Sequence, residues 1–235
     1  MLDEGLKGSG NYGVFGIGVY NGQGVSRAEA NDTMHVVLRL NTPWKMPSGQ
    51  IMEAGVQAYT GRYTSYTGPI RVPGISDPVT PVNDPADGPV DQRIGATFVY
   101  YPQPLGFTTE WNTGNGNELG PINNPPTKTL ITSQPLSGGY VLVNYKIDSE
   151  KWGTIFPFFR WQTFRGGYLW ERNSPQTYMG SFNLGMEWQF TPQMELTWEY
   201  DWVNQTNTGS NYRIIDGRYA QFQGDLLRFQ FQINY

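Results

Sequence analysis

The sequence predicts an all-β protein, an antiparallel transmembrane β-barrel of which about ten strands are present. The first indication is a series of segments in which apolar and polar residues alternate, separated by turns rich in Gly and Pro. The second is that long and short connections follow one another in strict order along the chain. A mean hydropathy of -0.50 does not oppose this prediction. A transmembrane strand needs only about 9–11 residues, and every second one is apolar.

The closing stretch, residues 218–235, shows the alternation most clearly. Its apolar side chains fall on one face of a strand, because successive side chains of a strand point in opposite directions. They are Leu227, Phe229, Phe231, Ile233 and Tyr235. The residues between them are Arg228, Gln230, Gln232 and Asn234. A closing strand that carries an apolar face to a terminal aromatic residue is typical of bacterial outer-membrane barrels.

Nine earlier segments are expected to be strands on the same grounds. In chain order they are residues 11–20, 34–40, 51–62, 92–101, 105–112, 138–147, 154–165, 176–190 and 194–205. The connections after the first, third, fifth, seventh and ninth strands are long and polar, and those between are short. Outer-membrane barrels have long extracellular loops and short periplasmic turns, so this order favours a barrel over a soluble sandwich.

The bulk composition bounds the possibilities further. We expect one domain, residues 1–235, without disulfides or Cys-ligated metal, because the chain has no cysteine. A net charge of -4 and a pI near 5.0 oppose a nucleic-acid partner. Residues 1–4 do not resemble a signal peptide, so we expect that residue 1 is not the natural start of an outer-membrane protein.

The charged residues of the predicted strands fall almost entirely on the polar face, which predicts an aqueous lumen. Arg62 and Arg165 are exceptions, and both lie at expected extracellular strand ends. The predicted pore-lining bases are His35, Arg39, Arg93, Lys146, Arg160 and Arg228. The predicted pore-lining acids are Glu53, Glu110, Glu187, Glu195, Glu199 and Asp201. Such charges can simply keep the wall wet and pair across strands, or the arginines among them can help to conduct anions.

The loop at residues 64–91 is the best candidate for a constriction that folds into the lumen, and an ordinary surface loop is the alternative. It contains Arg71, Asp77, Asp84, Asp87 and Asp91. Three of these acids could bind a divalent cation, but their spacing is not that of an EF-hand. No metal site and no cofactor is therefore predicted.

Two other classes of function remain open at this level. An outer-membrane hydrolase would need His35, the one histidine, as a base near the barrel rim, but no nucleophile motif accompanies it. A soluble carbohydrate-binding sandwich would explain the aromatic residues and turns. It would not explain the order of the connections or the closing strand.

Three segments carry a resemblance to a known family. Residues 12–24, YGVFGIGVYNGQG, residues 107–114, FTTEWNTG, and residues 157–161, PFFRW, are similar to strand segments of the phosphate-selective porin O and P family. The resemblance implies a sixteen-stranded homotrimeric porin, of which this chain would supply roughly the last ten strands. It also implies that the basic ladder for phosphate draws largely on earlier strands.

The expected function is therefore that of a porin in the bacterial outer membrane, not an enzyme. Small hydrophilic solutes would diffuse through a water-filled lumen, and anions such as phosphate are the solutes we expect. The expected partners are outer-membrane lipid, the solute and further copies of the chain.

Overall fold

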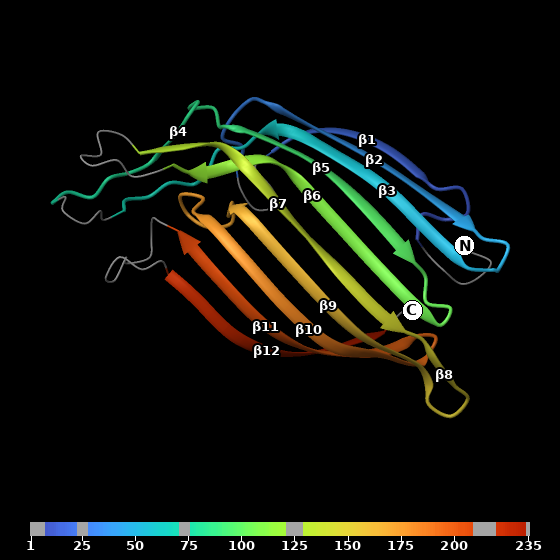
Figure 1. The fold of residues 1–235 in the computed structure, drawn as a ribbon. Coiled ribbons are helices and arrows are strands. Elements are labelled where there is room, and N and C mark those ends of the chain that lie inside the picture. The colour runs from blue at the N-terminus through green and yellow to red at the C-terminus, as the bar shows by residue number, and fades with distance from the viewer. Residues whose placement is uncertain (1–7, 23–27, 71–75, 121–128, 209–219, 234–235) are drawn as a thin grey trace.

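The computed structural model describes residues 8–22, 28–70, 76–120, 129–208 and 220–233. They form one curved sheet (Figure 1), and no helix in these ranges is long and apolar enough to cross a membrane. The strands are β1 (Val14–Asn21), β2 (Met34–Lys45), β3 (Ile51–Arg62), β4 (Val82–Asn83), β5 (Val90–Tyr100), β6 (Leu105–Leu119), β7 (Leu130–Tyr145), β8 (Ile147–Ser149), β9 (Gly153–Gly167), β10 (Gln176–Thr191), β11 (Met194–Thr208) and β12 (Ala220–Ile233).

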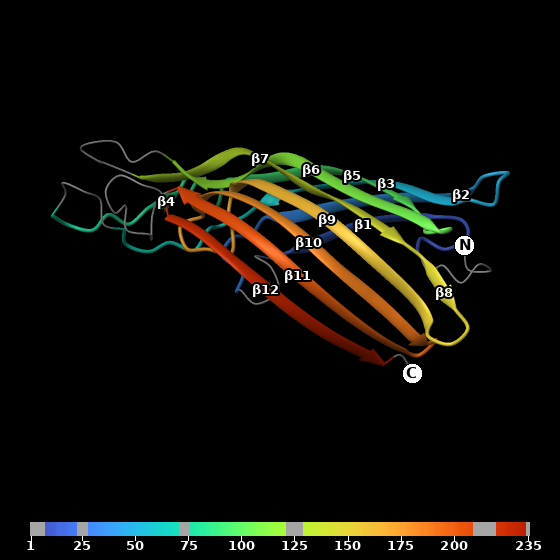
Figure 2. The ribbon, with the colours of Figure 1, turned by 60° about the horizontal axis from the view of Figure 1, so that its bottom comes forward.

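Ten long strands follow one another in the order β1-β2-β3-β5-β6-β7-β9-β10-β11-β12, and each pairs antiparallel with its neighbours. The short strand β4 pairs parallel with β7, and β8 pairs with β9. The prediction of an all-β antiparallel fold is confirmed. Within the described residues the sheet is not closed: β1 and β12 are its two edges, at opposite margins of the arch (Figures 1 and 2). Closure into a barrel stays a prediction.

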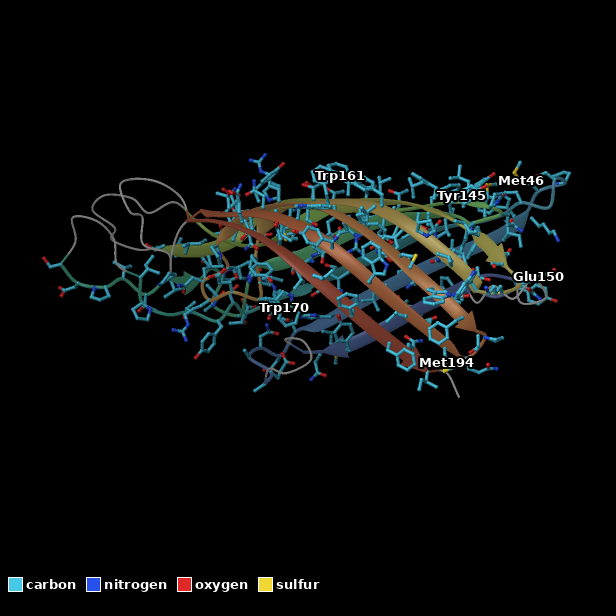
Figure 3. All side chains as sticks on the ribbon, turned by 90° about the horizontal axis from the view of Figure 1, so that it is seen from below. Met46, Tyr145, Glu150, Trp161, Trp170 and Met194 are labelled. Atoms are coloured by element: carbon cyan, nitrogen blue, oxygen red, sulfur yellow. The ribbon has the colours of Figure 1, made fainter. Side chains whose placement is uncertain are left out.

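The register places apolar side chains in continuous rows on one face of the sheet. One such row runs Leu38, Ala58, Ile94 across β2, β3 and β5. These rows are exposed: Ile17, Ile94 and Phe229 expose 68%, 59% and 66% of their surface. Trp161 and Tyr145, which belong to the same face, lie along the outer margin of the arch (Figure 3). The apolar face is thus the convex, outer one, and it does not pack into a dry interior as it would in a sandwich.

Aromatic rings meet on this outer face toward the end of the sheet where the connections are short. Trp44 and Phe98 have ring centroids 6.5 Å apart, and Phe98 and Phe107 follow at 6.4 Å. On the same outer face, but near the β12 edge of the sheet, Phe190 stacks on Phe231 with ring centroids 6.1 Å apart. Aromatic residues gather at this level on several strands.

The lengths of the connections confirm the predicted alternation. The short ones, residues 46–50, 101–104 and 192–193, lie at one end of the sheet, here called the short-connection end. The connections at residues 22–33, 63–89, 120–129 and 168–175 lie at the other, the long-connection end. Charged side chains on the outer face of the described strands lie close to the long-connection end: Arg62, Arg165 and Asp225.

One predicted connection is wrong in extent. We expected a loop over residues 113–137, but β6 continues to Leu119 and β7 begins at Leu130. The two strands remain paired, with Asn115 opposite Pro135 and Asn117 opposite Ser133. The sequence there is rich in Gly and Asn and lacks an apolar face. Main-chain hydrogen bonds need no such face, so the hairpin extends beyond the apolar band.

Most of the buried apolar residues lie at the long-connection end. Tyr63, Ile70, Leu119, Ile131 and Leu136 are buried there, where the segment after β3 packs against the β6–β7 hairpin. A polar network ties these segments together, as the following contacts show.

The buried Asn117 amide donates to the carbonyl oxygen of Tyr63 and, at 2.8 Å, to Ser65 Oγ. Ser65 Oγ also accepts from Ser174 Oγ at 2.7 Å, and the Asn173 side chain accepts from the Gly68 amide at 2.8 Å. A Cβ on Gly167 would lie 1.8 Å from the carbonyl oxygen of Asn117, so only glycine allows this approach. The segments at residues 63–70 and 168–175 are therefore held in fixed positions against the hairpin.

Candidate functional site

The polar face of the sheet is the concave, inner one, and it collects the charged residues that the sequence singles out. Its rows can be followed through the register, for example Arg39, Gln57, Gly95 and Asn112 across β2, β3, β5 and β6. Strand register places these predicted residues on this face: His35, Arg39, Glu53, Arg93, Glu110, Arg160, Glu187, Glu195, Glu199, Asp201 and Arg228.

A cluster of four charges joins β9, β11 and β12. Arg160 Nη2 lies 2.6 Å from Glu199 Oε1, and Arg160 Nε donates to the Asn183 side-chain oxygen at 3.2 Å. Arg228 is 3.7 Å from Glu199 and 3.6 Å from Asp201. Both carboxylates are buried. Two of the predicted anion-conducting arginines are therefore neutralised by two acids.

A second ion pair occupies β5. Arg93 donates from Nε and Nη2 to the two carboxylate oxygens of Asp91, at 2.9 and 2.8 Å. Asp91 is buried within the strand, and not in the loop where the sequence suggested it. Residues two apart in a strand share a face. With β5 beginning at Val90, Asp91 and Arg93 both belong to the strand, so their pairing follows from the strand bounds.

Arg39 differs from the other arginines of the inner face. Its Nε donates to the Asn41 side-chain oxygen at 3.1 Å, and Asn41 in turn donates to Glu53 at 2.6 Å. Glu53 also accepts from the Ser9 amide at 3.0 Å and from the Tyr101 hydroxyl at 3.3 Å. Among the described residues Arg39 makes no ion pair, so its charge is not cancelled by a contacting carboxylate.

Glycine residues open a hollow of about 510 Å³ beside Arg39 and Arg93. Gly16 and Gly18 of β1 and Gly95 of β5 line it. A Cβ on Gly95 would lie 2.1 Å from the Asn112 side-chain oxygen. The bare backbone therefore leaves room for polar side chains to lie flat on the sheet.

Two further inner-face acids, Glu110 and Glu187, are hydrogen-bonded to amide side chains. Glu110 accepts hydrogen bonds from Gln57 and from Asn112, both at 2.9 Å. Near the short-connection end, Glu187 accepts from Gln189 at 2.6 Å, and Glu195 follows on the neighbouring strand β11. Amide donors, and not cations, hold Glu110 and Glu187.

Lys146 lies between β7 and β8, beyond the end of the long strand. Its Nζ is 3.0 Å from Asp148 of the short strand β8. Hydrogen bonds from Lys146 and then from Thr154 hold the pKa of the Asp148 carboxyl below its ordinary value. Lys146 is therefore engaged by the turn at the short-connection end.

His35 is almost fully buried, and both ring nitrogens have partners. Nε2 lies 2.8 Å from the carbonyl oxygen of Arg62, and Nδ1 lies 3.0 Å from the Tyr59 hydroxyl. The carbonyl can only accept, so Nε2 carries the proton and Nδ1 accepts from Tyr59. Within the described part of the chain, no carboxylate and no serine contacts the ring. The arrangement is that of a structural histidine, without the partners that a hydrolase would need.

The acids of the loop at residues 64–91 do not come together. Asp91 belongs to the ion pair with Arg93, Asp87 lies 3.7 Å from Arg62, and the Asp84 main chain donates to Ile131 at 2.9 Å. In the described residues no group of three or more acidic or histidine side chains could hold a metal ion. Arg71 lies outside the described residues.

The comparison with protein families agrees with the two-faced sheet. A family model described as phosphate-selective porin O and P matches residues 3–235. No curated protein and no solved structure matches the chain. The match covers nearly the whole sequence and includes every strand of the sheet. The chain therefore belongs to the phosphate-selective porin O and P family.

Proposed function

We propose that the protein forms a water-filled channel in the bacterial outer membrane, through which small hydrophilic solutes diffuse. The observation that carries this proposal is the division of the sheet into two faces: exposed apolar rows outside and ionised, hydrogen-bonded side chains inside. A cation facing lipid at mid-bilayer costs about 2–4 kcal/mol, whereas the same cation facing water costs little. The described strands avoid that cost except near the long-connection end, where Arg62, Arg165 and Asp225 lie on the outer face.

Closure of the sheet is part of the proposal. In hydrocarbon, every unpaired main-chain N–H or C=O costs several kcal/mol, so the edges β1 and β12 must find partners in a membrane. We infer that further strands complete a sixteen-stranded barrel and that three copies assemble, as the family resemblance implies. The aromatic rings Trp44, Phe98 and Phe107 would then lie at the periplasmic interface.

The same proposal includes a preference for anions such as phosphate, supported by Arg39. Arg93, Arg160 and Arg228 are balanced by Asp91, Glu199 and Asp201. Arg39 keeps its charge beside a hollow lined by glycines. A guanidinium offers paired N–H donors that match the oxygens of phosphate, so Arg39 is the best placed of these residues to receive a passing anion.

The test is a planar-bilayer recording with the purified protein in a KCl gradient. We expect discrete conductance steps and a reversal potential shifted toward the equilibrium potential of chloride. A cation-directed reversal potential would overturn the anion preference, and the absence of any conductance would overturn the channel itself.

A further inference from the structure

A cavity of about 290 Å³ lies at the long-connection end of the inner face, apart from the hollow beside Arg39. Its lining includes Tyr20, Tyr59, Trp170, His35, Asp91 and Arg93. We propose that this cavity binds one ring of a neutral sugar. The inference rests on the proposed function and names a solute class that the channel would admit at its mouth.

Aromatic rings from three distant segments form the walls. Tyr20 of β1 lies 5.4 Å from His35, and Tyr59 of β3 meets the other side of His35 at 5.5 Å, measured between ring centroids. Trp170 comes from the connection between β9 and β10 and lies within the arch (Figure 3). Exposed aromatic surface rimmed by polar groups marks a binding site more often than an accident of folding.

Trp170 is 71% exposed, yet hydrogen bonds anchor the main chain of its loop. The Asn173 amide donates to the Tyr66 carbonyl at 2.8 Å, and the Ser174 carbonyl accepts from the Leu119 amide at 2.9 Å. Both Asn173 and Ser174 are fully buried. The fold thus fixes the main chain close to a large apolar ring that stands in water, and an ordered loop lowers the entropic cost of stacking a ligand on that ring.

The polar side of the cavity offers hydrogen-bond donors without net charge. Asp91 engages Nε and Nη2 of Arg93, and the remaining guanidinium N–H groups have no other partner among the described residues. They can donate to hydroxyl oxygens. The Tyr59 oxygen, whose proton goes to His35, can still accept one bond.

The charge balance selects the class of ligand. The buried Asp91 carboxylate cancels the charge of Arg93 and repels an anion, so phosphate would gain little here. A wholly apolar ligand would leave the N–H groups of Arg93 without water or partner, which is costly. A sugar ring has an apolar face that can stack on the aromatic side chains and hydroxyl groups at its edge that can accept hydrogen bonds from Arg93. The cavity volume of about 290 Å³ is just below the roughly 300–1,000 Å³ of small-molecule sites, which suits a single ring.

The experiment is isothermal titration calorimetry of the detergent-solubilised protein with D-glucose, with sorbitol and inorganic phosphate as comparison solutes. Sorbitol has similar hydroxyl groups but no ring to stack. We expect saturable binding of glucose and none of sorbitol. Trp170→Ala should weaken glucose binding about tenfold or more, from the loss of the stacking surface.

Trp152→Ala is the matched control, because Trp152 is also an exposed tryptophan but lies in the turn at the short-connection end. It should bind glucose as the native chain does. Equal heats for glucose and sorbitol, unchanged binding by Trp170→Ala, or phosphate binding that displaces glucose would overturn the proposal. Calorimetry does not require conduction, so loss of the channel and loss of the sugar site are distinguishable.

Discussion

Arg160 and Glu199 form an ion pair of 2.6 Å although their strands are not neighbours. Arg160 is on β9 and Glu199 on β11, and the intervening strand β10 presents Gly185 opposite Glu199. Arg160 lies opposite Asn183 of β10, and its Nε donates to the Asn183 side-chain oxygen at 3.2 Å, so the guanidinium crosses β10 along the sheet surface beside Asn183. The pair therefore braces three strands and not two.

The first prediction concerns this brace. Arg160→Gln should lower the free energy of unfolding by about 1–2 kcal/mol, because it leaves the buried Glu199 with only the longer contact to Arg228. Arg228→Gln, which removes contacts of 3.6 and 3.7 Å from a more exposed arginine, should cost less than about 1 kcal/mol. Denaturant unfolding in detergent measures both. If both variants lowered the free energy of unfolding equally, the ion pair across β10 would contribute no more than the longer contacts of Arg228.

The second prediction concerns Arg39. Arg39→Gln should reduce the anion-to-cation permeability ratio by about fivefold, since one unscreened charge acts on a passing ion with about 1 kcal/mol. Arg93→Gln alone leaves its partner Asp91 unpaired, so it should shift selectivity toward cations at least as strongly. The matched control is the double variant Asp91→Asn with Arg93→Gln, which removes both charges of the pair and should leave the ratio near the native value. Reversal potentials in a KCl gradient give all three ratios, and an unchanged ratio in Arg39→Gln would refute the role of Arg39.

The third prediction tests which face meets lipid. Phe229 and Gln230 are neighbours on β12 and point to the outer and inner faces. Phe229→Arg should destabilise the protein in phospholipid vesicles by about 2–4 kcal/mol, and Gln230→Arg should cost less than about 1 kcal/mol. Guanidinium titration in vesicles measures the difference. If Phe229 faced water instead, its replacement by arginine would be neutral or favourable, so the sign of the change decides the matter.

The fourth prediction concerns the polar anchor of the long connections. Asn117→Ala should lower stability by about 1–3 kcal/mol, because the Tyr63 carbonyl and Ser65 hydroxyl lose a buried donor. The segment at residues 63–70 should then be cut faster in limited proteolysis. Gln193→Ala, in an exposed short turn, serves as the control and should leave the digestion pattern unchanged. Equal digestion rates for both variants would mean that Asn117 does not hold the segment.

The strand pattern was predictable from the sequence where one face of the strand is apolar. The expected strand at residues 51–62 coincides with β3, and that at 176–190 differs from β10 by one residue. The pattern failed where that face ends. The end of β6 that includes Asn117, next to the long-connection end, carries no row of apolar residues, and the sequence suggested a loop there.

The inner face was predictable as a set of residues but not as a set of contacts. Alternation places Arg160, Glu199 and Arg228 on one side of their strands. Which of them meet depends on strand register, and a shift between Gln189 and Thr191 alters that register locally. The position of Trp170 could not be predicted from the sequence either, because buried hydrogen bonds from segments far apart in the chain fix its loop.

The fifth prediction concerns the space beneath His35. A Cβ on Gly61 would lie 2.5 Å from His35 Cδ2, and the ring cannot move freely because the Arg62 carbonyl and the Tyr59 hydroxyl hold its two nitrogens. Gly61→Ala should therefore cost about 1–3 kcal/mol of stability through overpacking. Gly180→Ala is the control: nothing lies within 4 Å of its added Cβ, so it should be neutral or slightly stabilising.

A double-mutant cycle separates the clash from any general loss of backbone freedom at Gly61. In the His35→Ala background the ring is gone, so Gly61→Ala should cost much less than in the native chain, with a coupling energy of about 1 kcal/mol or more. Thermal or denaturant unfolding of the four chains gives the coupling directly. Additive losses would mean that Gly61 is required for its own main-chain conformation and not to seat the histidine that orders Tyr59 at the wall of the cavity.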